Sequence, residues 1–148
     1  MLISRPSNIE KICAVEMKNI FRLILLFLFL QVSASGQQVI FCESVNDNTG
    51  EPYHASSYFI IGSNGGSLMM LLKLSDVINS NTLKIDVFKI DEETKKEVFN
   101  NTINANPQPH FTWIKKEIEF HLPGEYVIYV YDETDRLIGV GKVRIVVS

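Results

Sequence analysis

Three histidines are the residues of this sequence best suited to catalysis or zinc binding. His54, His110 and His121 lie far apart in the chain, each in an expected loop or at the end of an expected strand. A small secreted hydrolase or metal-dependent enzyme would need them to meet beside carboxylates, but no local motif such as His-Glu-x-x-His joins them. We therefore expect solvated or structural histidines and a protein that is not an enzyme, with the hydrolase as the alternative function.

Two acidic segments could instead bind calcium. Residues 132–135 (DETD) and 91–93 (DEE) each place three carboxylates within a short stretch. Oxygen-rich loops at the end of a β-sandwich can hold Ca²⁺, which makes Asp132, Glu133 and Asp135 a candidate site. Neither segment has the EF-hand spacing, and charged turns between strands are ordinarily solvated, so we expect no metal and no cofactor.

An aromatic strip is the candidate binding surface. In an extended strand over residues 126–131, Val127, Tyr129 and Tyr131 point away from the core, and Phe88 on an earlier strand could lie beside them. Tyrosine-rich patches of low charge are enriched at protein interfaces and also suit sugar stacking. The alternative is that this face is half-buried, or covered by a loop such as residues 100–110. Another alternative presents residues 104–110 as an inhibitor-like loop.

Short alternating apolar runs bounded by Gly, Pro, Asn and Asp indicate the elements that would position these residues. The runs predict a single all-β domain, an antiparallel sandwich of seven to eight strands. The segment 62–66 (GSNGG) predicts a hairpin or bulge between its flanking strands, and residues 45–55 and 100–110 are expected to be loops. The expected strands are 38–44, 57–61, 67–74, 83–90, 97–99, 111–120, 126–131 and 138–147.

Residues 122–128 (LPGEYVI) carry the most specific structural signal. Pro123 stiffens a turn, Gly124 permits a backbone conformation closed to other residues, and Tyr126 begins the inward-facing set of the strand. This segment resembles the corner before strand F of immunoglobulin-like β-sandwiches, a type common among secreted bacterial modules. The resemblance implies that the Tyr126 hydroxyl bonds back to the corner backbone. A leucine and an isoleucine stand where that family commonly has Asp and Cys.

The N-terminal residues predict export. Residues 23–30 (LILLFLFL) follow Lys18 and Arg22 and precede small residues, which is the pattern of a secretory signal peptide over residues 17–36. The apolar run is far shorter than the roughly 20 residues of a membrane span. We expect translation to begin at Met17, residues 1–16 to be a start-site artefact, and the domain to span 37–148 without a transmembrane segment.

Charge and cysteine content limit the classes of partner that the domain is expected to bind. Residues 37–148 keep 10 Lys and Arg against 15 Asp and Glu, so the net charge is 10 − 15 = −5. An acidic domain without a basic stripe argues against nucleic acid. Cys42 is the one cysteine left in the domain, and we expect a buried small hydrophobe; an intermolecular disulfide or reactive thiol is the alternative. The sequence thus predicts a secreted or periplasmic, non-enzymatic binding or structural module whose partner is a protein or a glycan.

Overall fold

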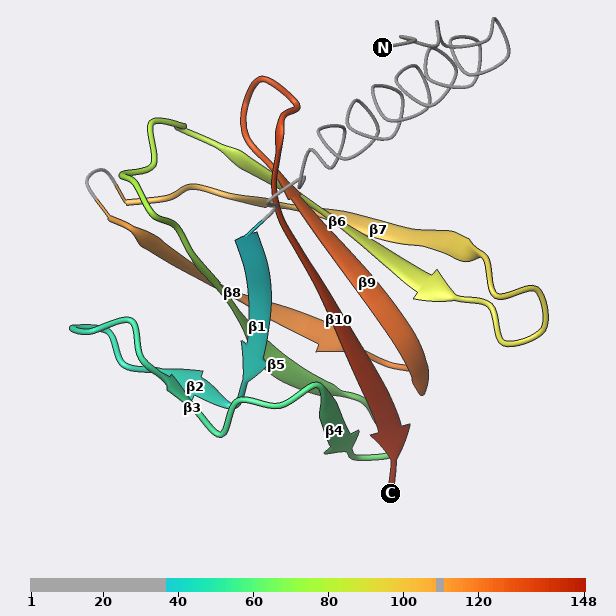
Figure 1. Ribbon diagram of the computed structural model, residues 1–148. Helices are drawn as coiled ribbons and strands as arrows, with labels where there is room; N and C mark the ends of the chain where they lie inside the picture. Colours follow the sequence, from blue (N-terminus) through green and yellow to red (C-terminus); the bar gives the residue numbers. More distant parts are fainter. Residues whose placement is uncertain (1–36, 109–110) are drawn as a thin grey trace, which may run out of the picture. The chain divides into compact units, whose positions relative to one another are not determined.

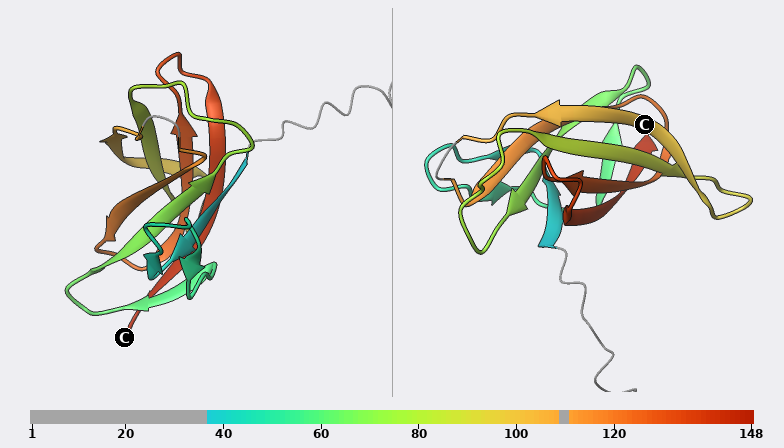
Figure 2. Two further views of the ribbon diagram at one scale, coloured as in Figure 1. Left: turned by 90° about the vertical axis from the view of Figure 1, so that its left-hand side faces the viewer. Right: turned by 90° about the horizontal axis from the view of Figure 1, so that it is seen from above.

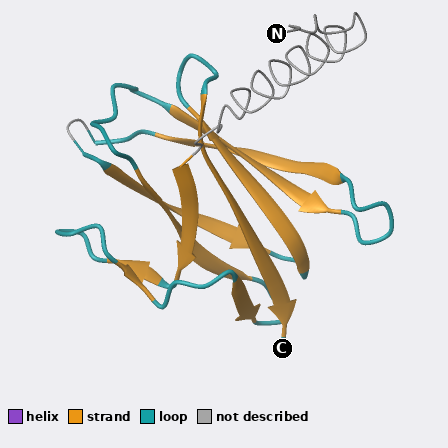
Figure 3. Cartoon of the chain, in the orientation of Figure 1, coloured by secondary structure: helices purple, strands orange, loops and turns teal. Residues whose placement is uncertain are grey.

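The computed structural model describes residues 37–108 and 111–148, and within them every regular element is a β-strand (Figures 1 and 3). The signal-peptide and start-site predictions for residues 1–36 lie outside the described residues, as does His110. The all-β prediction is confirmed. The strands are β1 (Gln37–Cys42), β2 (Ser44–Val45), β3 (Pro52–Tyr53), β4 (Tyr58–Ile61), β5 (Gly66–Lys73), β6 (Leu83–Ile90), β7 (Glu97–Ala105), β8 (Trp113–Phe120), β9 (Gly124–Tyr131) and β10 (Leu137–Val147).

The strands form one curled ladder in the order β7-β6-β9-β10-β1-β5-β8 (Figure 2). Strand β1 joins its two halves, because Gln37 and Gln38 pair in parallel with β10 whereas residues 39–42 pair antiparallel with β5. One layer is therefore β7-β6-β9-β10 and the other is β1-β5-β8. Placing β6, β9 and β10 opposite β5 and β8 is the strand arrangement of an immunoglobulin-like sandwich.

The core lies between these layers and follows from the period-two alternation of the strands. Strands β5, β6, β9 and β10 each bury every second side chain in this cluster. Strands β1, β4 and β8 add further members, among them Phe41, Phe59 and Phe120. The predicted inward set of β9, which begins at Tyr126 and continues with Ile128 and Val130, is confirmed. The most enclosed members of the core include Met70, Leu72, Leu83, Ile85, Ile118, Ile128, Val130 and Ile145.

A second, smaller cluster lies on the outer side of β1 and β5. Cys42 is fully buried there with Val45 and Leu71. The predicted role of Cys42 as a buried small hydrophobe is thus confirmed, and burial raises the pKa of its thiol. Residues 45–55 are not wholly loop as predicted, since β2 and β3 pair within this stretch as a small hairpin. Each of these strands has only two residues, which is too short for an alternation of apolar and polar side chains to appear among the surrounding turn residues.

The structure corrects two further predictions of local structure. Residues 57–61 and 67–74 do not form a hairpin: β4 pairs in parallel with β10 in the opposite layer, and a Gly62–Gly65 bridge is what remains of the turn. Residues 100–105 are not loop, because β7 continues to Ala105 along β6. Strand β7 is the last strand at its end of the ladder, so its asparagine side chains remain exposed to water. Their polarity therefore does not prevent the strand from forming.

The predicted corner before β9 is confirmed. The Tyr126 hydroxyl donates a hydrogen bond to the Leu122 carbonyl oxygen at 2.8 Å, and the Tyr126 ring packs edge-on against Phe120. Gly124 has a φ of 143°, a conformation that side chains oppose. The corner fixes where β9 begins and therefore which of its side chains point out of the sandwich.

Candidate functional site

The outer side of the β7-β6-β9 layer carries the aromatic side chains that the sequence singled out. We call Phe88, Phe99, Tyr129 and Tyr131 the aromatic face. Register brings them together: Phe88 of β6 lies opposite Phe99 of β7 and Val127 of β9, and Tyr129 lies opposite Asp86. Directly opposed residues point to the same side of a sheet, so three strands contribute to one surface.

The four rings touch in a chain across the strands. Phe88 meets Phe99 at 5.6 Å and Tyr129 at 5.7 Å between ring centroids, both edge-on. Tyr129 and Tyr131 stack at 6.4 Å with 29° between their planes. Edge-on pairs at these separations stabilise one another beyond their buried area, so the rings form a fixed array. Phe99 is 58% exposed, and the other three rings are half-buried.

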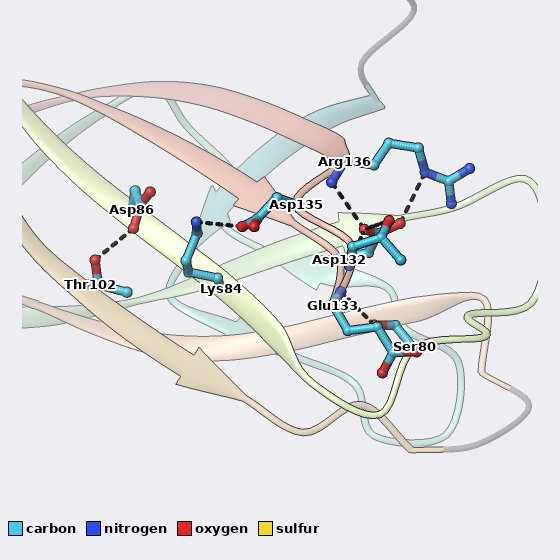
Figure 4. Close-up of polar contacts among 9 residues, drawn as sticks. Ser80, Lys84, Asp86, Thr102, Asp132, Glu133, Asp135 and Arg136 are labelled. Atoms are coloured by element: carbon cyan, nitrogen blue, oxygen red, sulfur yellow. Dashed lines mark hydrogen bonds and ion pairs between the residues drawn. The ribbon is translucent and has the colours of Figure 1, made fainter.

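Charged groups contact both tyrosines of this array. The Tyr129 hydroxyl donates to the Glu97 carboxylate at 2.8 Å, and burial together with that hydrogen bond raises the pKa of Tyr129 to about 12. Lys84 lies 4.9 Å from the centre of the Tyr131 ring. Its ammonium donates to the Asp135 carboxylate at 2.7 Å, and Figure 4 draws this second contact. The hydrogen bond to Asp135 raises the pKa of Lys84. The Tyr129 hydroxyl and the Lys84 ammonium are thus held in place by ion and hydrogen-bond partners on other strands and turns.

Val127 was predicted to belong to this surface, and that prediction is wrong. Its side chain points outward with Tyr129 and yet is only 1% exposed. Valine is shorter than Phe88 and Lys142 on the two neighbouring strands, so these side chains close over it. Val127 instead contributes to the wall of a groove of about 440 Å³ that contains no member of the aromatic face and is lined by Ser57, Ile90, Lys95, Glu125, Tyr126, Val127, Lys142, Val143 and Arg144.

The three carboxylates of the candidate calcium loop make hydrogen bonds and ion pairs within the protein, and they point to different partners. Asp132 accepts hydrogen bonds from both backbone and side chain of Thr134 and Arg136, and the Thr134 bond is the main cause that lowers its pKa to about 2 (Figure 4). Glu133 accepts from the backbone of Asn81, and Asp135 turns to Lys84. Across residues 37–108 and 111–148, no three His, Cys, Asp or Glu side chains are grouped to hold a metal.

The histidines that the structure describes serve separate surface contacts. His54 pairs with Glu43 at 2.9 Å and stacks on Tyr53. His121 lies 3.7 Å from Glu119 at the end of β8. The two histidines thus contact different acids: Glu43 lies between β1 and β2, and Glu119 lies on β8.

Sequence inspection missed Phe99 and Glu97 as members of the surface. Both lie on β7, which the sequence extended only from residue 97 to residue 99. The sequence did contain a usable signal, because the turn at residues 91–95 separates two strands that could pair as a β-hairpin. Such a hairpin between β6 and β7 brings Phe99 opposite Phe88.

Comparison with known proteins adds little detail. No family model matches the sequence, and no curated protein matches it. Among solved structures, the chain is similar to an immunoglobulin-like protein from Pseudomonas aeruginosa, with 14% identity over 76% of this chain and 99% of that one and a TM-score of 0.47. In the part of the chain that the structure describes, no helix has the length and apolar character to cross a membrane. The strand order and the tyrosine corner identify the described residues as an immunoglobulin-like β-sandwich.

Proposed function

We propose that this chain is an exported, non-catalytic binding module that contacts a protein partner through the aromatic face. The observation that carries the proposal is the fixed array of four rings outside the core. Phe99 is 58% exposed at one side of it, and charged groups border it. Aromatic anchors with a polar rim are typical of protein interfaces. Export is inferred from the signal-peptide pattern of residues 17–36.

Ring orientation favours a protein over a glycan. Sugars stack on the flat face of an exposed ring, whereas Phe88 packs edge-on against both Phe99 and Tyr129, with planes 75° and 86° apart. The surface therefore holds its rings in several orientations, with Glu97 and Lys84 beside the two tyrosines. The ammonium of Lys84 and the carboxylate of Glu97 would orient a partner whose side chains complement both signs.

A site-specific photo-crosslinking experiment tests the face. A photoactivatable phenylalanine analogue is introduced at Tyr131, and in a matched chain at Glu117 on the exposed side of β8, and each is irradiated in the cells that produce the protein. We expect a discrete heavier adduct with a second protein from position 131 and none from position 117. Absence of adducts at position 131, or equal adducts at both positions, would overturn the proposal. Binding of the wild-type protein to immobilised glycans would instead indicate that the partner is a sugar and not a protein.

Cell fractionation with N-terminal sequencing tests export. We expect the protein outside the cytoplasm with a first residue near Gln37. A cytoplasmic protein that retains residues 17–36 would contradict this part of the proposal.

A further inference from the structure

The two terminal strands of the sheet differ sharply in their protection. Strand β8 carries Lys115, Lys116, Glu117 and Glu119, four charged side chains among eight residues. Strand β7 is the other end of the ladder and carries one charge, Glu97, among nine residues. Each pairs with a single neighbour in the sheet, so each presents an unpaired row of backbone N–H and C=O groups.

Open edges of this kind join to other strands unless something prevents it. Natural proteins make their edges short, or place lysines, prolines or bulges on them. Strand β7 has no lysine or proline and is longer than β8. A single bulge at Asn100 interrupts it, where the partners of Val87 and Phe88 skip one residue. It also exposes 53% of Val98 and 58% of Phe99.

We propose that β7 pairs antiparallel with β7 of a second copy of this chain and so continues the sheet across a two-fold axis. The middle of β7 carries three asparagines, and amides both donate and accept hydrogen bonds: these are Asn100, Asn101 and Asn104. Ile103 is the apolar residue among them, and the Thr102 hydroxyl donates within the chain to Asp86. Such an edge complements itself. An interface in which the same surface of both copies meets is the ordinary form of a two-fold dimer.

Charge selects the antiparallel direction and a like partner. Antiparallel pairing centred on Asn101 places the two Glu97 carboxylates at opposite ends, about 27 Å apart at about 3.4 Å per residue. That separation exceeds the Debye length of about 8 Å at physiological salt. Parallel pairing would put the same two carboxylates side by side, where like charges oppose the pair.

The expected dimer is weak and strengthened by salt. One pair of strands buries less than the roughly 800 Å² per partner of a standard interface, so we expect a dissociation constant of about 10–100 μM. Each domain carries a net charge of 10 − 15 = −5. Salt screens the repulsion between the two negatively charged domains and leaves the backbone hydrogen bonds intact. We therefore expect the affinity of the dimer to rise by a few-fold between about 0.05 M and about 0.5 M salt.

Sedimentation velocity of the purified protein from about 5 to about 500 μM, a range that spans the expected dissociation constant, tests the proposal. We expect a monomer–dimer equilibrium that Asn100→Lys with Asn101→Lys abolishes, because lysines from both copies then meet near the axis. The control is Glu117→Gln with Glu119→Gln, which changes the net charge by the same amount on the opposite edge and should dimerise as the wild type does. The variant Asn100→Asp with Asn101→Asp should also be monomeric alone, and should pair with the lysine variant when the two are mixed.

These outcomes distinguish pairing along β7 from association through another surface and from loss of folding. A wild type that stays monomeric at the highest concentration, or a lysine variant that dimerises unchanged, overturns the proposal. Recovery of association on mixing the lysine and aspartate variants excludes loss of folding as the cause. Position 131 lies on β9, away from this edge, so the crosslinks expected there persist in the lysine variant, and the two proposals fail separately.

Discussion

The tyrosine corner provides the sharpest test of how this sandwich is stabilised. Tyr126 is 2% exposed, its hydroxyl donates to the Leu122 carbonyl at 2.8 Å, and its ring packs on Phe120 at 4.9 Å. The substitution Tyr126→Phe keeps the ring contact and removes the hydrogen bond alone. A typical intramolecular hydrogen bond contributes about 0.5–1.5 kcal/mol net, and an orphaned buried acceptor costs up to about 3 kcal/mol. The bond is only partly buried, since Leu122 is 59% exposed as a residue, and we therefore expect a loss of about 1 kcal/mol in the free energy of unfolding.

A second substitution separates the hydroxyl from the ring. Tyr126→Ala also removes the aromatic volume from the core and should cost about 3–5 kcal/mol. Urea unfolding followed by the fluorescence of Trp113, the chain's single tryptophan, measures both losses. Tyr53→Phe is the control, because Tyr53 is 59% exposed and its loss should stay within about 0.5 kcal/mol. If Tyr126→Phe unfolds at the same urea concentration as the wild type, the corner hydrogen bond does not stabilise this fold and the reasoning is wrong.

Three further predictions concern groups held inside the fold. The hydrogen bonds of Asp132, that from Thr134 foremost, lower its pKa to about 2, so its contribution is fully present above about pH 4 and is lost as the pH falls through about 2. Asp132→Asn should cost on the order of 2 kcal/mol at about pH 7 and flatten the fall in stability between about pH 4 and about pH 2, measured by urea unfolding at each pH. Gly141→Ala should cost more than about 2 kcal/mol in the same assay, since the new methyl would lie 2.6 Å from the Val39 Cβ and 2.7 Å from its carbonyl oxygen. The thiol of Cys42 should react with a soluble disulfide reagent about a thousandfold more slowly in buffer than in urea; a native protein that reacts as fast as the unfolded one would contradict its burial.

The parts of the fold that the sequence predicted are those specified locally. The alternation along β6, β9 and β10 reports which side of each strand is buried, because successive side chains point to opposite faces. The corner is local too, since Tyr126 and Leu122 are four residues apart and the conformation of Gly124 needs no distant partner. Short motifs with a direct steric or hydrogen-bonding cause could therefore be interpreted without knowing the topology.

The parts that the sequence did not predict depend on distant neighbours. Glycines at 62–66 indicate a turn, but they do not specify the layer in which β4 finds its partner, and Phe59 meets Ile145 of β10 in parallel. Strand β7 exposes nearly all its side chains, so it has no apolar alternation to reveal its length. The outward direction of Val127 was predicted correctly, but its burial was not, because burial is set by the longer side chains on β6 and β10.

Strand β10 determines which edges of the sandwich remain open. Along one side it pairs with β9, and along the other its beginning pairs with β1 and its end with β4, so both of its edges are occupied. Because β1 then carries the ladder to β5, the two layers close on this side without a disulfide, and Cys42 stays a free, buried thiol. Of the strands in the larger sheet that keep a free edge, β4 is only four residues long and β8 is charged. The pairing that closes the sandwich therefore directs association by strand addition to β7, which is long and nearly uncharged and whose Phe99 also belongs to the aromatic face.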